Sequence, residues 1–342
     1  MKALFIGFGN VGRKIASILA RERDRFPHLR DLEIEPVGIV TRSRGALVNP
    51  EGVSFSEALS MIEGHGKFDM NSRSFSQTGA LEAAQNLEYD VLVELSTLSI
   101  ERKGEPAVSH VRTALSRGKN VVSANKGPVA FGYAELAETA SEKDCRFLHE
   151  TVVMDGAPVF NLARCTLKGC TVTGIEGILN STTNFVLTRM EQGGSLEEAV
   201  KEAQRHGVAE ADPSHDLEGW DAAAKTAALA NVLMGARITP YDVIRTGITG
   251  VTQDHIAKAR SNGSCLKLIC RAKPEGGGIK ATVGVEEVPD THHYAAVTGG
   301  GAVLRIETDL MGPVLVTQEN PTLYDTAYGV LDDLLTLQRS MS

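Results

Sequence analysis

The sequence predicts an α/β protein in which a doubly wound parallel sheet is followed by a second domain of α+β type. Short apolar runs alternate with helical patterns through roughly the first 150 residues. A glycine-rich turn joins the first apolar run to the first helical pattern, and the strict alternation later ends. We therefore expect one domain at residues 1–148, with a C-terminal helix at 323–342 packing back on it, and a second domain at 149–322.

Apolar runs between helical patterns predict the buried strands of the first domain. The expected strands are Lys2–Ile6, Pro36–Val40, Asp90–Leu95, Asn120–Ser123 and Arg146–His149. The expected helices are Gly12–Arg23, Ser56–Glu63 with a serine cap, Glu105–Arg117 and Tyr133–Lys143. Because Gly45–Ser76 is rich in Gly, Ser and Asn, we expect an irregular excursion there at the edge of the domain.

The pattern changes in the second half of the chain, where strand-like runs are separated by long helical patterns. The expected strands are Thr171–Ile178, Leu266–Ala272 and Ile279–Val285. The expected helices are Leu196–His206 and Leu217–Met234, and the final helical pattern is Leu323–Leu337. Separate strands and helices of this kind predict an α+β domain.

Composition excludes several classes of protein. The 342-residue chain has a net charge of −8, which does not favour binding to nucleic acid, because phosphates require a basic surface. The most apolar long stretch, Ala222–Ala236, contains Lys225 and Asn231 and is too short to span a bilayer. No signal peptide is evident, and five scattered cysteines do not indicate a disulfide framework. We expect a cytoplasmic protein whose cysteines are small buried thiols rather than zinc ligands.

A glycine motif lies between the first strand and the first helix. The six residues that fit G-x-G-x-x-G are Gly7, Phe8, Gly9, Asn10, Val11 and Gly12. In this context the motif is typical of dinucleotide binding in a Rossmann-like sheet, because its glycines allow a tight turn, close approach of a pyrophosphate and helix–strand packing. A simple glycine turn is the alternative.

The end of the second expected strand indicates which nicotinamide cofactor binds. An enzyme that uses NAD tends to have an acidic residue there, on the ribose hydroxyls. This chain has Arg42 and Arg44 instead, and an arginine can pair with the 2′-phosphate of NADP. The sequence therefore favours NADP, with NAD possible, although two solvated loop arginines would give the same pattern.

Three further segments are dense in polar groups. Ser123–Pro128 follows a strand and contains Lys126, at the sheet edge where ligands bind. Gly177–Asn184 is a run of hydroxyl and amide side chains that can cap a helix or bind a carboxylate. Gly207–Lys225 ends with Asp221 and Lys225 on one helix face. A surface lysine, a structural cap and an exposed ion pair are the respective alternatives.

Together these segments resemble the homoserine dehydrogenase family over essentially the whole chain. Gly7–Gly12 is similar to that family's cofactor loop, and Ser123–Gly127 is similar to its lysine motif. Asn180–Asn184 is similar to its N-G-T-x-N loop, with Ser181 in place of the usual glycine. Gly207–Lys225 resembles its long signature G-Y-x-E-x-D-P-x-x-D-x-x-G-x-D-x-x-x-K, with Val208 in place of tyrosine. The valine puts one substrate hydrogen bond in doubt but leaves the reaction intact.

The resemblance implies interconversion of L-aspartate 4-semialdehyde and L-homoserine, within amino-acid biosynthesis. Hydride passes between the nicotinamide and the aldehyde carbon, and a lysine ammonium stabilises the developing alkoxide and delivers the proton. The implied catalytic residues are Lys225, Lys126 and Asp221. The implied substrate contacts are Glu210, Asp216, Thr182 and Asn180. The implied cofactor contacts are Gly7, Gly9, Asn10, Val11, Gly12, Arg42, Arg44, Thr97 and Lys126.

The resemblance also implies a monovalent cation and a homodimer. The cation, expected to be sodium, would be held by Glu150 and by the carbonyls of Val153, Asp155 and Ala157. Strands within roughly residues 265–324 would form the dimer interface. Because the chain ends about where the core fold should end, we expect a monofunctional enzyme without a C-terminal regulatory domain.

Three other kinds of protein share part of this pattern. Another NADP-linked oxidoreductase would have the glycine motif but would not need the Glu210–Lys225 signature. Aspartate-semialdehyde dehydrogenase would need a cysteine nucleophile, and no cysteine lies in an evident active-site context. A catalytically dead NADP-binding sensor would be favoured by loss of Lys126 or Lys225, and both are present.

Overall fold

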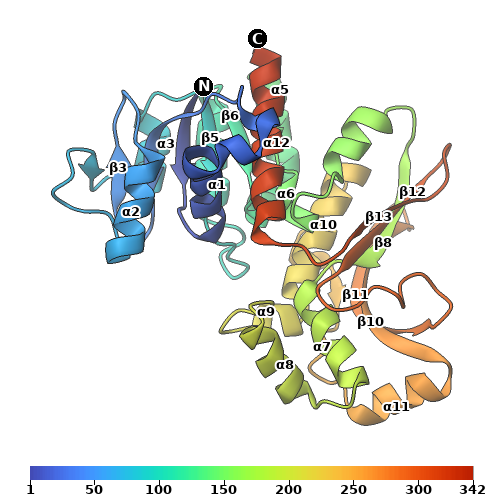
Figure 1. Cartoon of the computed structure of the whole chain (residues 1–342). Coiled ribbons are helices and arrows are strands. Elements are labelled where there is room, and N and C mark those ends of the chain that lie inside the picture. Colours follow the sequence, from blue (N-terminus) through green and yellow to red (C-terminus); the bar gives the residue numbers. More distant parts are fainter. Residues whose placement is uncertain (342) are drawn as a thin grey trace. The chain divides into compact units, whose positions relative to one another are not determined.

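The computed structural model describes residues 1–341, which divide into two compact units (Figure 1). The first unit holds Met1–Gly156 together with the segment that begins at Thr322, and the second unit is Ala157–Pro321. The first unit extends past residue 148 because the short helix α6 (Thr151–Met154) is hydrogen-bonded to the C-terminal helix: Thr151 Oγ1 donates to the Thr326 carbonyl at 3.0 Å.

The sheet of the first unit has seven strands in the order β4-β3-β2-β1-β5-β6-β7. They are β1 (Lys2–Ile6), β2 (Glu35–Val40), β3 (Ala46–Val48), β4 (Phe75–Ser76), β5 (Val91–Glu94), β6 (Asn120–Ser123) and β7 (Phe147–Leu148). Neighbouring strands in the part β2-β1-β5-β6-β7 are parallel. Strands β3 and β4 continue the sheet beyond β2, and each is antiparallel to its neighbour. This arrangement confirms the predicted parallel, Rossmann-like sheet.

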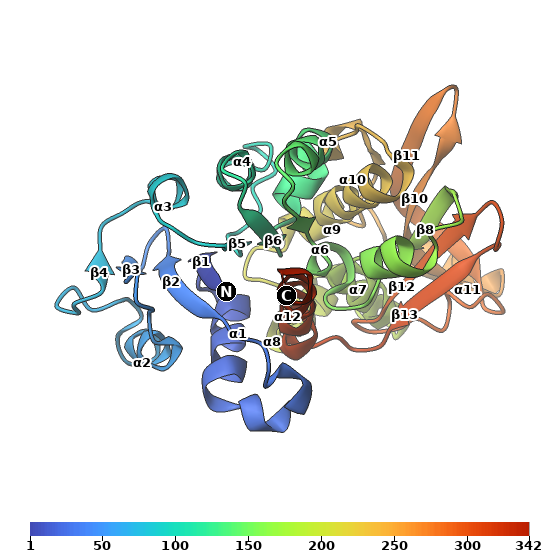
Figure 2. The same cartoon turned by 90° about the horizontal axis from the view of Figure 1, so that it is seen from above.

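Helices cover both faces of this sheet, which is why the strands between them read as continuous apolar runs. They are α1 (Asn10–Arg21), α2 (Phe55–His65), α3 (Ala80–Asn86), α4 (Ala107–Ser116), α5 (Lys126–Glu142), α6 and α12 (Leu323–Met341), with 3₁₀ turns at Arg23–Arg25 and Pro27–Leu29. Figure 2 shows α1, α2 and α12 on one face and α3, α4 and α5 on the other. Phe5 and Phe55 meet edge to face at 5.3 Å in the core beneath α2.

Two expectations for the first unit were wrong in detail. The segment 45–76 is not simply irregular, because it holds β3, α2 and β4. Strands of three and two residues are too short to show an alternating pattern. Helix α5 begins at Lys126 rather than at Tyr133, since the Asn125 side chain caps it by accepting the Gly127 N–H at 2.8 Å.

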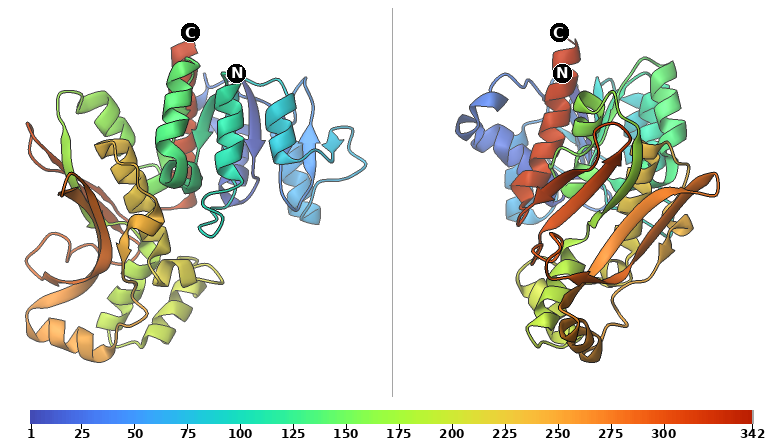
Figure 3. Two further views of the ribbon diagram at one scale, coloured as in Figure 1. Left: turned by 180° about the vertical axis from the view of Figure 1, so that it is seen from behind. Right: turned by 90° about the vertical axis from the view of Figure 1, so that its right-hand side faces the viewer.

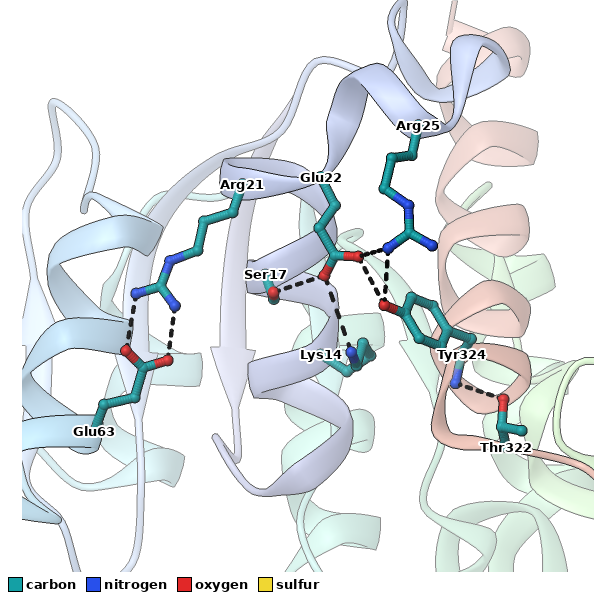
Figure 4. A network of polar contacts seen from close by, with 8 residues as sticks. All are labelled: Lys14, Ser17, Arg21, Glu22, Arg25, Glu63, Thr322 and Tyr324. Carbon is teal, nitrogen blue, oxygen red and sulfur yellow. Dashed lines mark hydrogen bonds and ion pairs between the residues drawn. The ribbon is translucent and has the colours of Figure 1, made fainter.

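The C-terminal helix α12 is part of the first unit's core. Its side chains in that core are Ala327, Val330, Leu331, Leu334 and Leu337. Figure 4 shows how its first turn is attached to the end of α1: the Tyr324 hydroxyl donates to Glu22 at 2.7 Å, and Lys14 Nζ lies 3.9 Å from the centre of the tyrosine ring. Arg25 pairs with the same glutamate at 2.6 Å. Hydrogen bonds from Tyr324 and Ser17 lower the pKa of the Glu22 carboxyl.

The second unit is built on a six-stranded sheet in the order β13-β12-β8-β10-β11-β9. The strands are β8 (Val172–Ile178), β9 (Ile244–Arg245), β10 (Ser264–Glu275), β11 (Gly278–Pro289), β12 (Ala302–Thr308) and β13 (Val314–Gln318). All neighbouring pairs are antiparallel except β9 with β11. The sequence predicted parts of β8, β10 and β11 and did not identify the other three strands.

Helices of the second unit pack on this sheet and lead into it. They are α7 (Ser181–Glu191), α8 (Leu196–Arg205), α9 (Ser214–Leu217), α10 (Trp220–Met234) and α11 (Gln253–Ser261), with a π-helical turn at Leu162–Thr166 and a 3₁₀ turn at Pro240–Asp242. Helix α10 lies along one face of the sheet, against β8, β10 and β11 (Figure 3). Its alanines are buried there, which explains the small-residue composition of the helix. Within residues 1–341, no helix has both the length and the hydropathy needed to cross a bilayer.

Candidate active site

The glycine motif forms the turn from β1 into α1. Gly7 has a φ of +104°, and a Cβ on it would lie 2.6 Å from the backbone of Leu95. A Cβ on Gly12 would lie 3.1 Å from the Gly7 carbonyl, whereas Gly9 faces open space. Gly7 and Gly12 are therefore required for packing, and Gly9 leaves room for a ligand beside the first turn of the helix, where N–H groups point outward.

The two arginines after β2 have different environments. Arg44 Nη1 donates to the carbonyl of Phe8, inside the glycine loop, at 3.0 Å, and its backbone N–H donates to Thr41 Oγ1 at 2.9 Å. Arg42 is exposed. Arg44 therefore stabilises the glycine loop, while Arg42 is the arginine whose guanidinium is accessible to an anion.

Lys126 occupies the first position of α5, directly after β6. It is half-buried, and the Asn125 cap fixes the backbone on either side of it. A Cβ on Gly127 would lie 2.9 Å from Cα of Gly104, so only glycine allows the loop before α4 to approach this turn so closely. Thr97 is exposed on the loop after β5. These residues share the carboxyl edge of the parallel strands, where ligands bind in such sheets.

A cluster of polar groups lies in the second unit between α7, α9 and α10. The Asn180 amide donates to Asp216 Oδ1 at 2.7 Å and to Asp221 Oδ2 at 3.0 Å. Lys225 Nζ lies 3.4 Å from Asp221 Oδ2 and donates to the Leu179 carbonyl at 2.7 Å. The expected ion pair is therefore present, with side chains 15% and 18% exposed, and it is part of a larger network rather than a solvated surface pair.

Local sequence explains how this cluster forms. Asn180 caps α7 by accepting the Thr183 N–H at 2.8 Å, which leaves its amide free to face α9 and α10. Gly219, with a φ of +80°, joins those two helices and brings Asp216 and Asp221 to the same amide. The geometry of Asn180 is thus consistent both with a helix cap and with a place in a ligand-binding site.

The electrostatics of the cluster are unusual for an acidic group. Burial raises the pKa of Asp216, and the negative charge of Asp221 raises it further, while hydrogen bonds from Asn180 and Thr182 and the charge of Lys225 act in the opposite direction. When all three groups are ionised, the cluster has two carboxylates and one ammonium. Such a site has an excess negative charge that suits a cationic group of a ligand.

Other expected substrate contacts lie around this cluster. Thr182 is buried, and its hydroxyl donates to the Val208 carbonyl at 3.1 Å. Glu210 is exposed on the loop after α8, and Gln204 Nε2 donates to its carbonyl at 3.1 Å. The structure therefore brings Asn180, Asp216 and their partners together and leaves the carboxylate of Glu210 outside the network.

The residues expected to bind a cation are divided between the two units. Glu150 is buried, and its N–H donates to Asp333 Oδ2 at 2.9 Å. Asp155 has a φ of +49° and accepts a hydrogen bond from Thr326 at 2.8 Å, and Ala157 begins the second unit. Within the described residues, no group of three or more His, Cys, Asp and Glu side chains has metal-binding geometry.

The five cysteines are free thiols. The expectation that they are buried is confirmed for Cys270 and was wrong for Cys165, which is exposed because it lies on the surface π-helical turn, while the other three are half-buried. Cys270 is fully buried beside Thr226, and burial raises its pKa to about 11.

Comparison with known proteins matches both units to one family. A family model described as the NAD-binding domain of homoserine dehydrogenase matches residues 7–150, and a model described as homoserine dehydrogenase matches residues 158–335. The chain belongs to the homoserine dehydrogenase family. It is 34% identical to the NAD(+)-dependent homoserine dehydrogenase of Pseudomonas canavaninivorans, over 99% of this chain and 96% of that protein.

Archaeal homoserine dehydrogenases are similar over the same length. The enzyme of Methanocaldococcus jannaschii is 34% identical over 99% of both chains. The structure of a putative homoserine dehydrogenase from Archaeoglobus fulgidus superposes with a TM-score of 0.85 and 32% identity, covering 98% of this chain and 99% of that one. A hyperthermophilic archaeal homoserine dehydrogenase solved with NADPH gives a TM-score of 0.81 at 26% identity, covering 99% and 98%.

Membership of the homoserine dehydrogenase family confirms the predicted fold and the predicted class of enzyme. The protein is an NAD(P)-dependent oxidoreductase with a cofactor-binding unit and a catalytic unit. Sequence reasoning missed a hydrogen-bonded group beside Asn125 that consists of the buried Glu94 and His110 and the half-buried Ser96. The sequence signal that could have revealed this group was Glu94, an acidic residue near the end of the apolar run 90–95.

Proposed function

We propose that this homoserine dehydrogenase interconverts L-aspartate 4-semialdehyde and L-homoserine, with Lys225, Lys126 and Asp221 as its catalytic residues and NADP as its preferred cofactor. The observation that carries the proposal is the cluster in which Asn180 joins Asp216 and Asp221 beside Lys225. It combines an anionic site for the substrate's ammonium group with a cationic side chain for its oxygen.

The roles follow from charge and from the hydrogen-bonding capacity of each group. Asp216 binds the substrate ammonium, with Glu210 and the Thr182 hydroxyl as further contacts. Lys225 donates a proton to the carbonyl oxygen as it becomes an alkoxide and takes the proton back in the reverse direction. Asp221, 3.4 Å from that amine, orients it toward the reacting oxygen. Lys126 stabilises the same developing negative charge.

Bound NADPH supplies the hydride, and the residues present fit a dinucleotide. Gly9 leaves space for a pyrophosphate beside the first turn of α1, to which Asn10 and Val11 contribute N–H groups. Arg42 would pair with the 2′-phosphate, while Arg44 holds the loop through the Phe8 carbonyl. The parallel edge near Thr97 receives the nicotinamide end.

The direct test is oxidation of L-homoserine by the purified protein, followed through the absorbance of the reduced nicotinamide, with NADP and NAD compared at equal concentration. We expect turnover with both and a higher kcat/KM with NADP. The matched variants are Lys225→Met and Lys201→Met, because Lys201 forms an exposed i,i+4 pair with Glu197 at 2.6 Å. Loss of turnover in both variants, or in neither, would contradict the role of Lys225.

We also propose a cytoplasmic homodimer and a sodium ion at Glu150. The proposed dimer interface consists of strands within residues 265–324, where Arg271 pairs within its own chain with Glu176 at 2.5 Å and also with Glu286, on neighbouring strands. Sedimentation should give twice the chain mass, and charge reversal of Arg271 should reduce the sedimenting mass.

Replacing sodium by tetramethylammonium should reduce activity if Glu150 holds a cation, and should leave activity unchanged otherwise.

A further inference from the structure

We propose that His110 and Glu94 are positioning residues for Lys126, acting through a buried chain of hydrogen bonds that passes through Ser96 and Asn125. The inference rests on the proposed role of Lys126 in the reaction. It adds two ionisable residues to the machinery of the first unit, neither of which carries out the chemistry itself.

The chain begins with a hydrogen-bonded histidine–carboxylate pair in the interior. His110 on α4 is 3% exposed, Glu94 at the end of β5 is 0% exposed, and His110 Nδ1 lies 2.8 Å from Glu94 Oε2. The other carboxylate oxygen, Oε1, accepts the backbone N–H of Ser96 at 2.8 Å and also the Ser96 hydroxyl. Both oxygens of a fully buried carboxylate are therefore occupied, as burial of a charge requires.

Asn125 transmits this arrangement to α5. Its Nδ2 donates to the Ser96 carbonyl at 2.9 Å and to the Ser96 hydroxyl at 3.2 Å, while its Oδ1 accepts the N–H of Gly127 at 2.8 Å. One side chain thus connects the loop after β5 with the first turn of the helix. Lys126 is the first residue of that turn, so its backbone cannot move without breaking one of these bonds.

The location of the chain favours a functional reason over a purely structural one. Glu94 and Ser123 are paired at the carboxyl ends of neighbouring parallel strands, the edge at which ligands bind. Two apolar residues of similar volume would stabilise this position as well as this buried polar pair does. They would not orient Ser96, whose N–H and hydroxyl donate to Glu94, and Asn125 is in turn oriented by its hydrogen bonds to Ser96. The chain of hydrogen bonds therefore fixes the orientation of Ser96 and Asn125, which hydrophobic packing alone would leave undetermined.

Four variants test this inference in the full-length enzyme. His110→Ala removes the donor to Glu94, and His110→Asn restores a donor near the position of Nδ1. Asn125→Asp keeps the acceptor that caps α5 but replaces the donor to Ser96 with a carboxylate oxygen. The fourth variant combines His110→Ala with Asn125→Asp. Turnover is expressed per NADPH-binding site, counted by fluorescence titration, so that a loss of folded protein does not lower the measured kcat.

We expect kcat to fall by roughly 10- to 100-fold in His110→Ala and in Asn125→Asp, since small misplacements of catalytic groups have effects of this size. The KM for homoserine should change less than about twofold, because the proposed substrate ligands Asn180 and Asp216 belong to the second unit. His110→Asn should recover most of the lost turnover. The double variant should be no slower than the slower single variant, because both changes break the same chain.

Three results would overturn the inference: unchanged kcat in His110→Ala, no recovery in His110→Asn, or losses that multiply in the double variant. If His110→Ala does not fold, Asn125→Asp and His110→Asn carry the test alone, since an unaltered kcat in Asn125→Asp is equally decisive. Lys126→Met separates this failure from failure of the proposed function. Normal turnover in that variant contradicts the role of the lysine itself, whereas its loss beside an unaffected His110→Ala contradicts only the positioning chain.

Discussion

Replacing Asn180 should destabilise the second unit by an amount that can be worked out from its contacts. The side chain is 4% exposed, caps α7 and bonds to two carboxylates. Loss of the cap costs about 1 kcal/mol. Each bond to a carboxylate contributes about 1.5 kcal/mol, near the lower limit for charged acceptors because Asp216 and Asp221 are only half-buried. Asn180→Ala should therefore lose about 4 kcal/mol of unfolding free energy.

Calorimetry of the purified variant measures this loss. For a unit of this size, about 4 kcal/mol corresponds to a decrease in Tm of roughly 10 °C. Asn180→Ser is the matched control, because serine retains the cap and lacks the amide, so it should lose about 3 kcal/mol. A serine variant as stable as the wild type would refute the reasoning, since the bonds to the two carboxylates would then contribute nothing.

Asn180→Asp adds a dependence on pH. It keeps the cap acceptor but places a third carboxylate against the other two, so the folded state should raise the pKa of the new carboxyl. A folded-state pKa above the unfolded value means that stability is lost as the pH rises through that interval. The difference in Tm between this variant and Asn180→Ser should therefore be largest near neutral pH and should diminish as the pH falls toward 5.

Three further predictions concern catalysis and the cofactor. Lys225→Ala should reduce kcat by orders of magnitude while the NADPH dissociation constant, measured by fluorescence, stays within about twofold; a large loss of NADPH binding would contradict the separation of these roles. Arg42→Ala should weaken the binding of NADPH more than the binding of NADH, whereas Arg44→Ala should weaken the binding of both through the glycine loop. Equal losses of NADPH and NADH affinity in Arg42→Ala would show that Arg42 does not bind the 2′-phosphate. Asp221→Asn should move the acid limb of the kcat/KM profile to lower pH. The charge of Asp221 contributes to the raised pKa of Asp216, whose ionised form binds the substrate, so removing that charge should lower the pKa of Asp216. A shift of the acid limb to higher pH would contradict that assignment.

Elements with a clear apolar run or a strong helical period were predictable from sequence. The strands at 2–6 and 120–123 follow from short apolar runs, and the helix at 196–205 follows from its helical pattern. The short strands β3, β4 and β9 were missed because two or three residues show no period. The start of α5 was misplaced because Gly127 and Pro128 resemble a loop, although proline is well tolerated in a first turn.

The candidate site was likewise predictable from sequence only in part. Spacing places Asp221 and Lys225 on one helix face, and a helix requires that result. Spacing cannot reveal that Asn180 contacts both Asp216 and Asp221, because that depends on how α7 meets α9 and α10. The difference between Arg42 and Arg44 was invisible for a similar reason: only the fold brings the Phe8 carbonyl to one guanidinium and leaves the other in solvent.

The position of α12 has a consequence for how this polypeptide is made. A ribosome releases residues in order, so β1 and α1 emerge well before α12, the helix that completes their core. Until Leu331 and Leu334 leave the exit tunnel, the nascent first unit exposes the apolar surface that they later cover. Messages truncated within the codons of α12 should therefore yield chains that bind chaperones and are degraded, even though every residue proposed to contact substrate or cofactor has already been translated.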